Sequence, residues 1–483
     1  MKELFRWPDR HLRFATEGPA SGGSTGHIVR RANMLGHCDV GVEVHTHHSG
    51  TGNGERAAKY LFDACAACGW GRQDSLVVKT ASDTFHASRL ALLADELAEH
   101  VFGDIASRLS GDIGSKVYDK KPGDGASYDE CMQCYKEIHD LLMGDLDAAF
   151  GSVAPCHRHG HDCCFKATAV AATPKLRVLI AGTSCVGWSA AGQKAKLQHP
   201  SMLTFLLFVA DAVHQKYDVI CHENTEGMPD ELLEYFFGPT HLVVPLRLAP
   251  YHLGMPVRRP RKYTICIRKG IEVTSANFSQ AEFLALFAQV PCLDPHDLWC
   301  APPEATEERY MRRATECGML PKGEAGKKDQ YLLLTPYQKR RIQTAIQSMP
   351  EGVDPSQISV GIQKTPKFTT PGLFIPTLLT NSSIWSVRLC RLADPKEMLI
   401  FQGIPSYDAV SEDYAAPWTR SVEASISATA AHTLADSAMC CPIIGTVLLY
   451  ALASTRPRTT MPSTMRFRYM ASVLDFDIAD EDD

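Results

Sequence analysis

The chain has 483 residues, so an average domain of roughly 150 residues predicts two to four structural units. Hydrophobic residues make up 45% of the chain and charged residues 22%, which excludes collagen-like, fibrous and wholly disordered proteins. The formal net charge of −6 does not indicate a nucleic-acid-binding protein, although an acidic segment can mask a basic one. Residues 475–483 carry six acids and no base, and we expect them to form a solvated terminus.

The N-terminal residues lack the apolar core of a secretory signal. We therefore expect the 17 cysteines to be reduced thiols in the nucleus or the cytoplasm. No apolar run reaches the roughly 18 to 20 residues that cross a bilayer, and the longest, Pro442 to Ala453, is typical of a buried helix. The sequence thus predicts no membrane contact, and it leaves the oligomeric state open, a monomer included.

Short apolar runs alternate with helical stretches after residues 1–36, which are rich in Gly, Ser and Arg and are expected to be loosely ordered. Helices are expected at 55–65, at 86–99 and in a Cys- and His-containing insertion at about 106–172. This alternation predicts an α/β fold, a doubly wound and mostly parallel sheet with helices on both faces. The expected strands are 40–46, 75–81, 100–105, 177–182, 218–224, 241–248 and 262–270.

The regular alternation ends after residue 270. Residues 271–385 hold many prolines and mixed short runs, which is typical of a second, less regular domain. Helical character returns within 386–455, so we expect the chain to close back on the domain formed by 37–270. A tail at 456–483 follows. The sequence therefore predicts one domain interrupted by a smaller inserted one.

The segment RVLIAGTSCVGWS is a buried strand that ends in a loop containing Cys185. In an open parallel sheet, ligands and catalytic groups collect beyond the carboxyl ends of the strands, where Cys185 would lie. A small buried thiol is the alternative interpretation, because free cysteines are often buried.

The segment DVICHENTEGM repeats this arrangement, with Glu223 and Asn224 at the end of a strand. Partial burial would raise the pKa of the Glu223 carboxyl, so that it could hold a proton near neutral pH. A helix N-cap pair is the alternative interpretation. Cys221 is expected to be a strand side chain, and its closeness to Glu223 makes it a second candidate nucleophile.

Arg258, Arg259 and Arg261 crowd a loop that enters the strand KYTICIRKG. Basic residues at this density usually face solvent. Arg259 and Arg261 alternate, however, and would point the same way. This spacing allows both guanidinium groups to converge on one anionic or polar ligand.

These three segments, in this order, resemble the C5-cytosine methyltransferase family. TSCVGWS matches the family's proline–cysteine loop, HENTEGM its glutamate–asparagine motif, and residues 257–261 its glutamine–x–arginine–x–arginine motif. Residues 392–407 look like the segment that follows target recognition, and residues 434–445 look like the closing motif. The resemblance covers about residues 38–270 and 385–453.

The resemblance implies a Rossmann-like methyltransferase fold with a target-recognition domain at 271–385. It also implies the activity of a DNA (cytosine-5-)-methyltransferase, which moves a methyl group from S-adenosylmethionine to C5 of cytosine. Cys185 would add to C6 of the base, and a protonated Glu223 would hydrogen-bond the ring. Arg259 and Arg261 would orient the base, which must first be flipped out of the duplex.

The glycine-rich turn after the first expected strand falls where the family's cofactor loop belongs. The implied contacts of the cofactor are Ser49, Gly50, Thr51, Gly52, Asp83, Asp104 and Ser437, and Asn224 is an implied contact of the base.

Several residues depart from the family pattern. Ser184 stands for the proline before the nucleophile, and Val257 stands for the glutamine. On the cofactor side, Thr46 and His48 stand for an acid and a phenylalanine, Ala81 stands for the ribose-binding glutamate, and Asp436 with Ser437 stands for glycine–asparagine.

The middle of the chain is basic, with 15 Lys and Arg against 10 Asp and Glu over residues 251–350. RYMRR at 309–313 and PYQKRRIQ at 336–343 could contact nucleic-acid phosphates or form solvated helix faces. DNA is the expected partner. RNA, including tRNA, is an alternative substrate, and a nucleic-acid-binding homologue without turnover is an alternative function.

One Cys- and His-rich cluster falls outside the family pattern, since a Cys-x-x-Cys pair precedes CHRHGHDCC at 156–164. These donors suit a tetrahedral zinc ion. The Cys-x-x-Cys pair lies in an expected helix and the family needs no zinc, so the favoured interpretation is that no metal binds. If zinc binds, the candidate ligands are Cys131, Cys134, Cys156 and Cys163.

Overall fold

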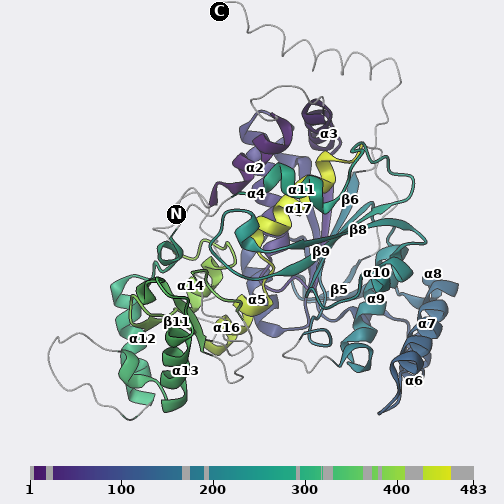
Figure 1. Ribbon diagram of the computed structural model, residues 1–483. Helices are drawn as coiled ribbons and strands as arrows, with labels where there is room; N and C mark the ends of the chain where they lie inside the picture. The colour runs from purple at the N-terminus through teal and green to yellow at the C-terminus, as the bar shows by residue number, and fades with distance from the viewer. Residues whose placement is uncertain are drawn as a thin grey trace, which may run out of the picture.

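The protein is described by a computed structural model over residues 5–17, 26–165, 175–189, 195–289, 294–316, 318, 330–362, 373–378, 383–407 and 428–457. A large α/β domain carries a smaller domain at one side (Figure 1). The acidic terminus expected at 475–483 lies outside the described residues.

A nine-stranded sheet forms the centre of the large domain, in the order β5-β4-β3-β2-β1-β6-β7-β9-β8. All seven strands expected from the sequence are present, with boundaries that differ by a few residues. The strands are β1 (Val42–His47), β2 (Leu76–Ser82), β3 (His100–Phe102), β4 (Val153–Cys156), β5 (His161–Cys164), β6 (Leu176–Gly182), β7 (Val219–Asn224), β8 (His241–Leu248) and β9 (Arg261–Arg268).

The five central strands of the sheet are, in spatial order, β3, β2, β1, β6 and β7, and they run parallel to one another. β8 and β9 pair antiparallel at one side of the sheet, and β4 and β5 pair antiparallel at the other. Strand order reverses between β1 and β6, which makes this pair the topological switch point of the sheet. The predicted doubly wound, mostly parallel α/β fold is confirmed.

Alternate residues of β6 face two separate hydrophobic cores. Val178 and Ile180 belong to one core, and Leu179 and Ala181 belong to the other. This two-sided burial explains why the strand is an unbroken apolar run in the sequence. The first core is covered by α4 (Asn53–Ala67), α11 (Gln280–Phe287) and α17 (Cys441–Ala453), and the second by α7 (Tyr128–Gly144), α9 (Ser201–His214) and α10 (Asp230–Phe237).

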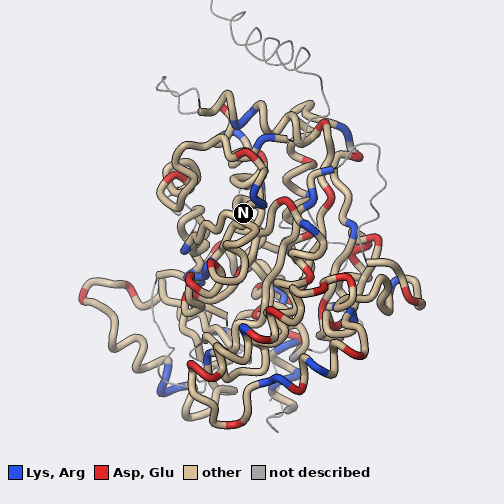
Figure 2. Tube along the Cα trace, turned by 90° about the vertical axis from the view of Figure 1, so that its right-hand side faces the viewer, with Lys and Arg blue, Asp and Glu red and all other residues tan. Residues whose placement is uncertain are grey.

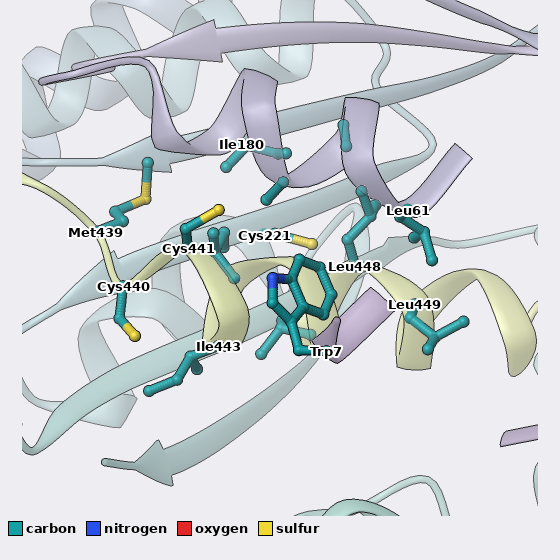
Figure 3. Close-up of a cluster of buried hydrophobic side chains, with 14 of the residues drawn as sticks. Trp7, Leu61, Ile180, Cys221, Met439, Cys440, Cys441, Ile443, Leu448 and Leu449 are labelled. Atoms are coloured by element: carbon teal, nitrogen blue, oxygen red, sulfur yellow. The ribbon is translucent and has the colours of Figure 1, made fainter. Parts of the chain in front are cut away.

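The N-terminal segment is better ordered than the sequence indicated. Residues 7–16 form α2 (Trp7–Thr16) and residues 26–40 form α3 (Gly26–Val40), so the prediction of a loosely ordered lead-in is wrong for the described part. Trp7 is buried against α17 (Figure 3), and a Cβ on Gly445 would lie 1.9 Å from the Trp7 ring. Apolar residues at helical spacing in α2 pack against α4 and against the C-terminal helix α17.

α17 is buried along its whole length. Together with most of α16 (Ala428–Ser437) it lies in a stretch, Ala430–Ala453, that is long and apolar enough to cross a bilayer by length and composition alone. This stretch contains Asp436 and is not an uninterrupted apolar run. In the folded protein, 89% of the apolar window of this stretch is buried. Its apolar character is therefore used in the core of the large domain, as was expected for Pro442 to Ala453.

The insertion after β3 contains three helices, α6 (Gly111–Asp119), α7 and α8 (Leu146–Ala149), which are followed by the β4–β5 hairpin. α5 itself (His86–Asp95) precedes β3. The hairpin was not expected, because its short strands carry Cys, His and Pro rather than an alternating apolar pattern. It extends the main sheet beyond β3.

The smaller domain contains a three-stranded antiparallel sheet in the order β10-β11-β12. Its core is formed by residues such as Ile342, Ile362 and Trp385. α11 lies with the core of the large domain instead, and the chain crosses to the smaller domain after it. The elements are α12 (Pro303–Glu316), α13 (Pro336–Gln347), β10 (Ser359–Ile362), β11 (Ser383–Ser386) and β12 (Arg391–Leu392), followed by α14 (Pro395–Ile400).

Candidate active site

The predicted catalytic side chains meet at the carboxyl ends of β6 and β7, beside the switch point. β9 runs antiparallel to β7, with Glu223 opposite Tyr263 and Asn224 opposite Lys262. The beginning of β9, with Arg261, therefore lies at the edge where β7 ends. Segments separated by up to 76 residues in sequence are thus placed at one edge by strand direction alone.

Cys185 lies in the loop directly after β6 and is half-buried. Its carbonyl accepts hydrogen bonds from the amides of Trp188, at 3.0 Å, and Ser189, at 2.9 Å, which form a tight turn. Burial raises the pKa of the Cys185 thiol, and the positive charges of Arg261 and Arg259 act in the opposite direction. The resting thiol is therefore protonated, with two guanidinium groups near enough to favour the thiolate.

Glu223 ends β7 as a buried carboxyl, and its Oε1 lies 3.2 Å from Nε of Arg261. A Cβ on Gly182 would lie 3.4 Å from Oε2 of Glu223, so the glycine at the end of β6 leaves room for this carboxyl. Burial raises the pKa of Glu223, and Arg261 and Arg259 partly oppose that rise. Burial therefore favours the protonated form of this carboxyl, against the effect of the two guanidinium groups.

Asn224 is buried and holds the loop that carries Cys185. Its side-chain amide donates to the carbonyl and to Oγ1 of Thr183, at 3.2 and 3.1 Å, while its Oδ1 accepts from the amide of Thr225 at 2.8 Å. His222 bonds the same Thr183 hydroxyl at 2.6 Å. These contacts make Asn224 a positioning residue for the loop, where the sequence suggested a contact with the base.

Thr183 and His222 were not identified from the sequence. The available signal was a pair of polar residues at the ends of two strands that are otherwise apolar and buried. Buried polar side chains in proteins are usually hydrogen-bonded. Once β6 and β7 are known to be neighbours, Thr183 and His222 can therefore be predicted to bond each other. Strand adjacency is the information that the sequence lacks.

Arg259 does not converge with Arg261 on a common open position, as its spacing had suggested. Its guanidinium donates to the carbonyls of Leu378 and Asp436, at 3.2 and 2.5 Å, and to that of Ala438 at 3.2 Å. Its Nη1 also lies 3.7 Å from the Asp436 carboxylate. Arg259 therefore fastens the returning C-terminal segment to the beginning of β9, and only Arg261 pairs with Glu223.

The predicted cofactor loop follows β1 and is closed by its own backbone. The amide of Ser49 donates to the Ser82 carbonyl and that of Gly52 to the Ser49 carbonyl, both at 3.0 Å. Gly50 and Gly52 have φ values of 58° and 83°, the left-handed region that favours glycine. A Cβ on Gly50 would lie 3.0 Å from the Ser437 carbonyl oxygen. The returning chain thus packs directly on this loop.

The two predicted aspartates differ in their environment. Asp83 accepts from the amides of Gly50 and Phe85, both at 2.8 Å, and burial raises the pKa of its carboxyl. Asp104 is exposed at the end of β3 and accepts from the amide of Ala106 at 2.9 Å. Asp83 therefore holds the shape of the loop, whereas Asp104 has an open face toward solvent.

A buried acid beneath this loop was missed. Glu55, in the first turn of α4, accepts a hydrogen bond from the hydroxyl of Thr46, which also bonds the Ser49 hydroxyl at 2.6 Å. Burial raises the pKa of Glu55 to about 7. Thr46 stands where the resembled family has an acid, and the structure places an acid from α4 against that position.

Of the four zinc ligands suggested by the sequence, Cys156 and Cys163 come together, whereas Cys131 and Cys134 lie elsewhere. Cys131 lies on α7 in a hydrophobic core with Tyr135 and Ile138, where its thiol approaches the Ala126 carbonyl at 3.9 Å. Cys156 and Cys163 lie instead on the β4–β5 hairpin. Cys131 and Cys134 are therefore excluded from a common group with them among the described residues.

The basic stretches of the smaller domain divide into buried and exposed residues. Arg309 is largely buried, with its guanidinium bonded to the Ala393 carbonyl and 3.8 Å from the Asp394 carboxylate, so it is not available to a phosphate. Arg312 and Arg340 are exposed. Figure 2 shows Lys and Arg interspersed with Asp and Glu along the chain, without a region of one sign over the view.

No protein-family model and no curated protein matches this sequence. Solved structures do match, each over 85% of this chain. The Dnmt2 methyltransferase of S. pombe is 10% identical with a TM-score of 0.41, over 98% of its own chain. The methyltransferase EhMeth of Entamoeba histolytica is 11% identical with a TM-score of 0.38, over 98% of its chain. A mutant of DNMT2 from Spodoptera frugiperda is 10% identical with a TM-score of 0.36, over 99% of its chain. The first two are named as methyltransferases and the third as a DNMT2 mutant.

Proposed function

We propose that this protein transfers a methyl group from S-adenosylmethionine to C5 of cytosine in DNA. The observation that carries the proposal is the placement of Cys185, Glu223 and Arg261 at neighbouring strand ends, beside the glycine loop that follows β1. Ligands of open α/β sheets bind outside the carboxyl ends of the strands at the switch point. A nucleophile, a proton-holding acid and a cation are therefore grouped where a small ligand is expected.

The loop at 49–52 fits a cofactor that approaches the backbone closely. Two of its four residues are glycines in the left-handed region, where the absence of a side chain lets another group approach the backbone, as the Ser437 carbonyl oxygen does at Gly50. Ser49, Gly50, Thr51 and Gly52 would hold S-adenosylmethionine together with Asp83, Asp104 and Ser437. When bound there, the cofactor supplies an electrophilic methyl group.

Cys185 provides the nucleophile. Cytosine C5 is a poor nucleophile by itself, and addition of the Cys185 sulfur to C6 makes C5 electron-rich. The thiol must lose its proton for this step, and the positive charges of Arg261 and Arg259 favour the thiolate against the effect of burial. Loss of the C5 proton after methylation then expels the sulfur and restores the free thiol.

Glu223 and Arg261 would bind the base. The raised pKa of the Glu223 carboxyl supports a protonated form that hydrogen-bonds N3 and the exocyclic amine of cytosine. Arg261, whose Nε pairs with Glu223, would orient that carboxyl and stabilise negative charge that develops on the ring. Asn224, His222 and Thr183 keep the Cys185 loop in register with β7. Cytosine in a duplex must be flipped out to reach this edge.

A mechanism-based trap tests this proposal. A DNA duplex that contains 5-fluorocytosine cannot lose its C5 substituent as a proton, so with S-adenosylmethionine the enzyme should remain covalently attached and migrate as a stable adduct. Cys185→Ala should abolish the adduct. Cys221→Ala is the matched control, because Cys221 is fully buried on β7 and burial raises the pKa of its thiol to about 12.

The outcomes separate the alternatives. Adduct formation that survives Cys185→Ala, or the absence of an adduct with both DNA and tRNA that contain 5-fluorocytosine, overturns the proposed chemistry. Labelled methyl transfer to tRNA but not to DNA would keep the chemistry and overturn the substrate. A protein that binds DNA but binds no S-adenosylmethionine by calorimetry would be a nucleic-acid-binding homologue without turnover.

A further inference from the structure

We propose that His100, Cys156, His159 and Cys163 form a structural Zn²⁺ site, separate from the candidate active site. His100 begins β3, Cys156 ends β4, His159 lies in the turn that follows, and Cys163 lies on β5. The ligand atoms of all four side chains lie within 4.8 Å of one another. Among the described residues this is the group of His, Cys, Asp and Glu side chains placed to hold a metal ion.

The distances within the group fit the edges of a tetrahedron. Nδ1 of His159 lies 3.4 Å from Sγ of Cys156 and 3.3 Å from Sγ of Cys163, and Nδ1 of His100 lies 3.9 Å from Sγ of Cys156. Ligands about 2.0 to 2.3 Å from a tetrahedral zinc ion are separated from one another by about 3.3 to 3.8 Å. The side chains are therefore already oriented toward a common centre.

The donor set selects the metal. Two thiols and two imidazoles are the ligands of closed structural zinc sites, whereas Mg²⁺ and Ca²⁺ prefer oxygen. All four coordination positions would be filled by this chain, which leaves none for substrate. Cys156 and Cys163 are buried and His159 is exposed, so the ion would lie at the surface end of the hairpin with its sulfur ligands inward.

The site would fasten the base of the insertion to the main sheet. The β4–β5 hairpin is joined to β3 by a single residue pair, Phe102 with Cys156, and by the amide of His157, which donates to the Val101 carbonyl at 2.7 Å. The insertion leaves the sheet after β3 and returns at β4. A metal ion held by His100 and by the hairpin would therefore lock both ends of the insertion together.

This lock also lies next to a predicted cofactor contact. A Cβ on Gly103 would lie 3.2 Å from Nε2 of His157, in the turn between two of the proposed ligands, and Asp104 is the next residue. Arg158 in the same turn donates to the carbonyls of Leu92 and Leu93, at 3.3 and 3.5 Å, at the end of α5. The zinc ion would thus stabilise one wall beside the end of β3 without entering the chemistry.

Metal analysis of the full-length protein tests the site. Protein purified without chelators should contain one zinc ion per chain by elemental mass spectrometry. Cys163→Ser and His159→Ala should lose most of this zinc. Cys134→Ser is the matched control, because Cys134 lies on α7 outside the group, and it should retain zinc. A protein without zinc, or zinc that is unaffected in Cys163→Ser, overturns the site.

Cobalt substitution keeps the test independent of whether the variants fold. The unmodified protein, depleted of zinc by a chelator and loaded with Co²⁺, should show the intense visible bands of tetrahedral cobalt and the near-ultraviolet bands of thiolate ligands. Depletion should also lower the thermal unfolding midpoint, and re-addition of Zn²⁺ should restore it. Octahedral cobalt spectra overturn the proposal, as would a Cys156–Cys163 disulfide in the mass of the protein as purified.

Discussion

The two sides of the switch point bury a carboxyl in different ways. On the β7 side, Glu223 has a cation beside it, with Nε of Arg261 at 3.2 Å from its Oε1. On the β1 side, Glu55 is bonded by the hydroxyl of Thr46, and burial raises its pKa to about 7. Burial raises the pKa of both carboxyls, but nearby positive charge from Arg261 and Arg259 opposes the rise only for Glu223.

The two sides therefore differ in what their polar groups do. On the β7 side, the charged groups face one another across strand ends and remain able to respond to a ligand. On the β1 side, the polar atoms are largely used to hold the loop itself, as the bonds from Gly50 to Asp83 and from Thr46 to Ser49 illustrate. Most residues that depart from the resembled pattern, such as Thr46 and Ser437, lie on this second side.

The largest loss of stability is expected on the β7 side, where Arg259 binds the returning C-terminal segment. Arg259→Ala removes three hydrogen bonds to buried carbonyls and the partner of Asp436, which we expect to cost about 3 to 5 kcal/mol of unfolding free energy. Arg258→Ala, at an exposed neighbour, should change it by less than about 0.5 kcal/mol. Urea unfolding of both variants measures the difference in unfolding free energy. Equal losses in the two variants would contradict the role of Arg259 in holding the returning segment.

A smaller, pH-dependent effect is expected on the β1 side. Folding raises the pKa of Glu55 from 4.5 to about 7, so this group favours the folded state most below pH 4.5 and its contribution is lost as the pH rises through 7. Between about pH 5 and about pH 8, the unfolding free energy of the unmodified protein should therefore fall by about 2 to 3 kcal/mol, and that of Glu55→Gln should not show this fall.

Unfolding midpoints across this pH range test the Glu55 prediction. The variant keeps an oxygen that can accept the Thr46 hydroxyl, so its packing is preserved. Glu234→Gln, at an exposed position of α10, is the control and should follow the unmodified protein. Parallel pH profiles for all three proteins would show that folding does not raise the pKa of Glu55, and would contradict the prediction.

The smallest effect is expected at the loop glycines. Gly50→Ala and Gly69→Ala each place a side chain in the left-handed region, at a cost of about 1 to 2 kcal/mol. Gly69 has open space around its Cβ position, whereas Gly50 lies against the Ser437 carbonyl. Gly50→Ala should therefore be the less stable of the two and, under the proposed function, should alone weaken S-adenosylmethionine binding by calorimetry. Equal stability of the two variants would show that the returning chain does not press on the loop.

The sequence alone predicted the sheet because the central strands are buried on both faces and appear as continuous apolar runs. It also placed Cys185, Glu223 and Arg261 at or near the ends of such runs, as the structure has them. The α2 helix was missed for the opposite reason. Its apolar face packs against α4 and against α17, which is more than 400 residues away, so its own segment does not show what would cover it.

The sequence determined which residues lie at the ends of strands, because a strand that is buried on both faces is a continuous apolar run whose ends can be located. Tertiary structure decided what those residues touch. Arg259 and Arg261 are two positions apart, yet one binds the returning backbone and the other binds Glu223. His100 joins Cys156, His159 and Cys163 only because β3 and β4 are neighbours. Partners of buried polar groups are fixed by packing between distant segments, and spacing along one chain does not encode them.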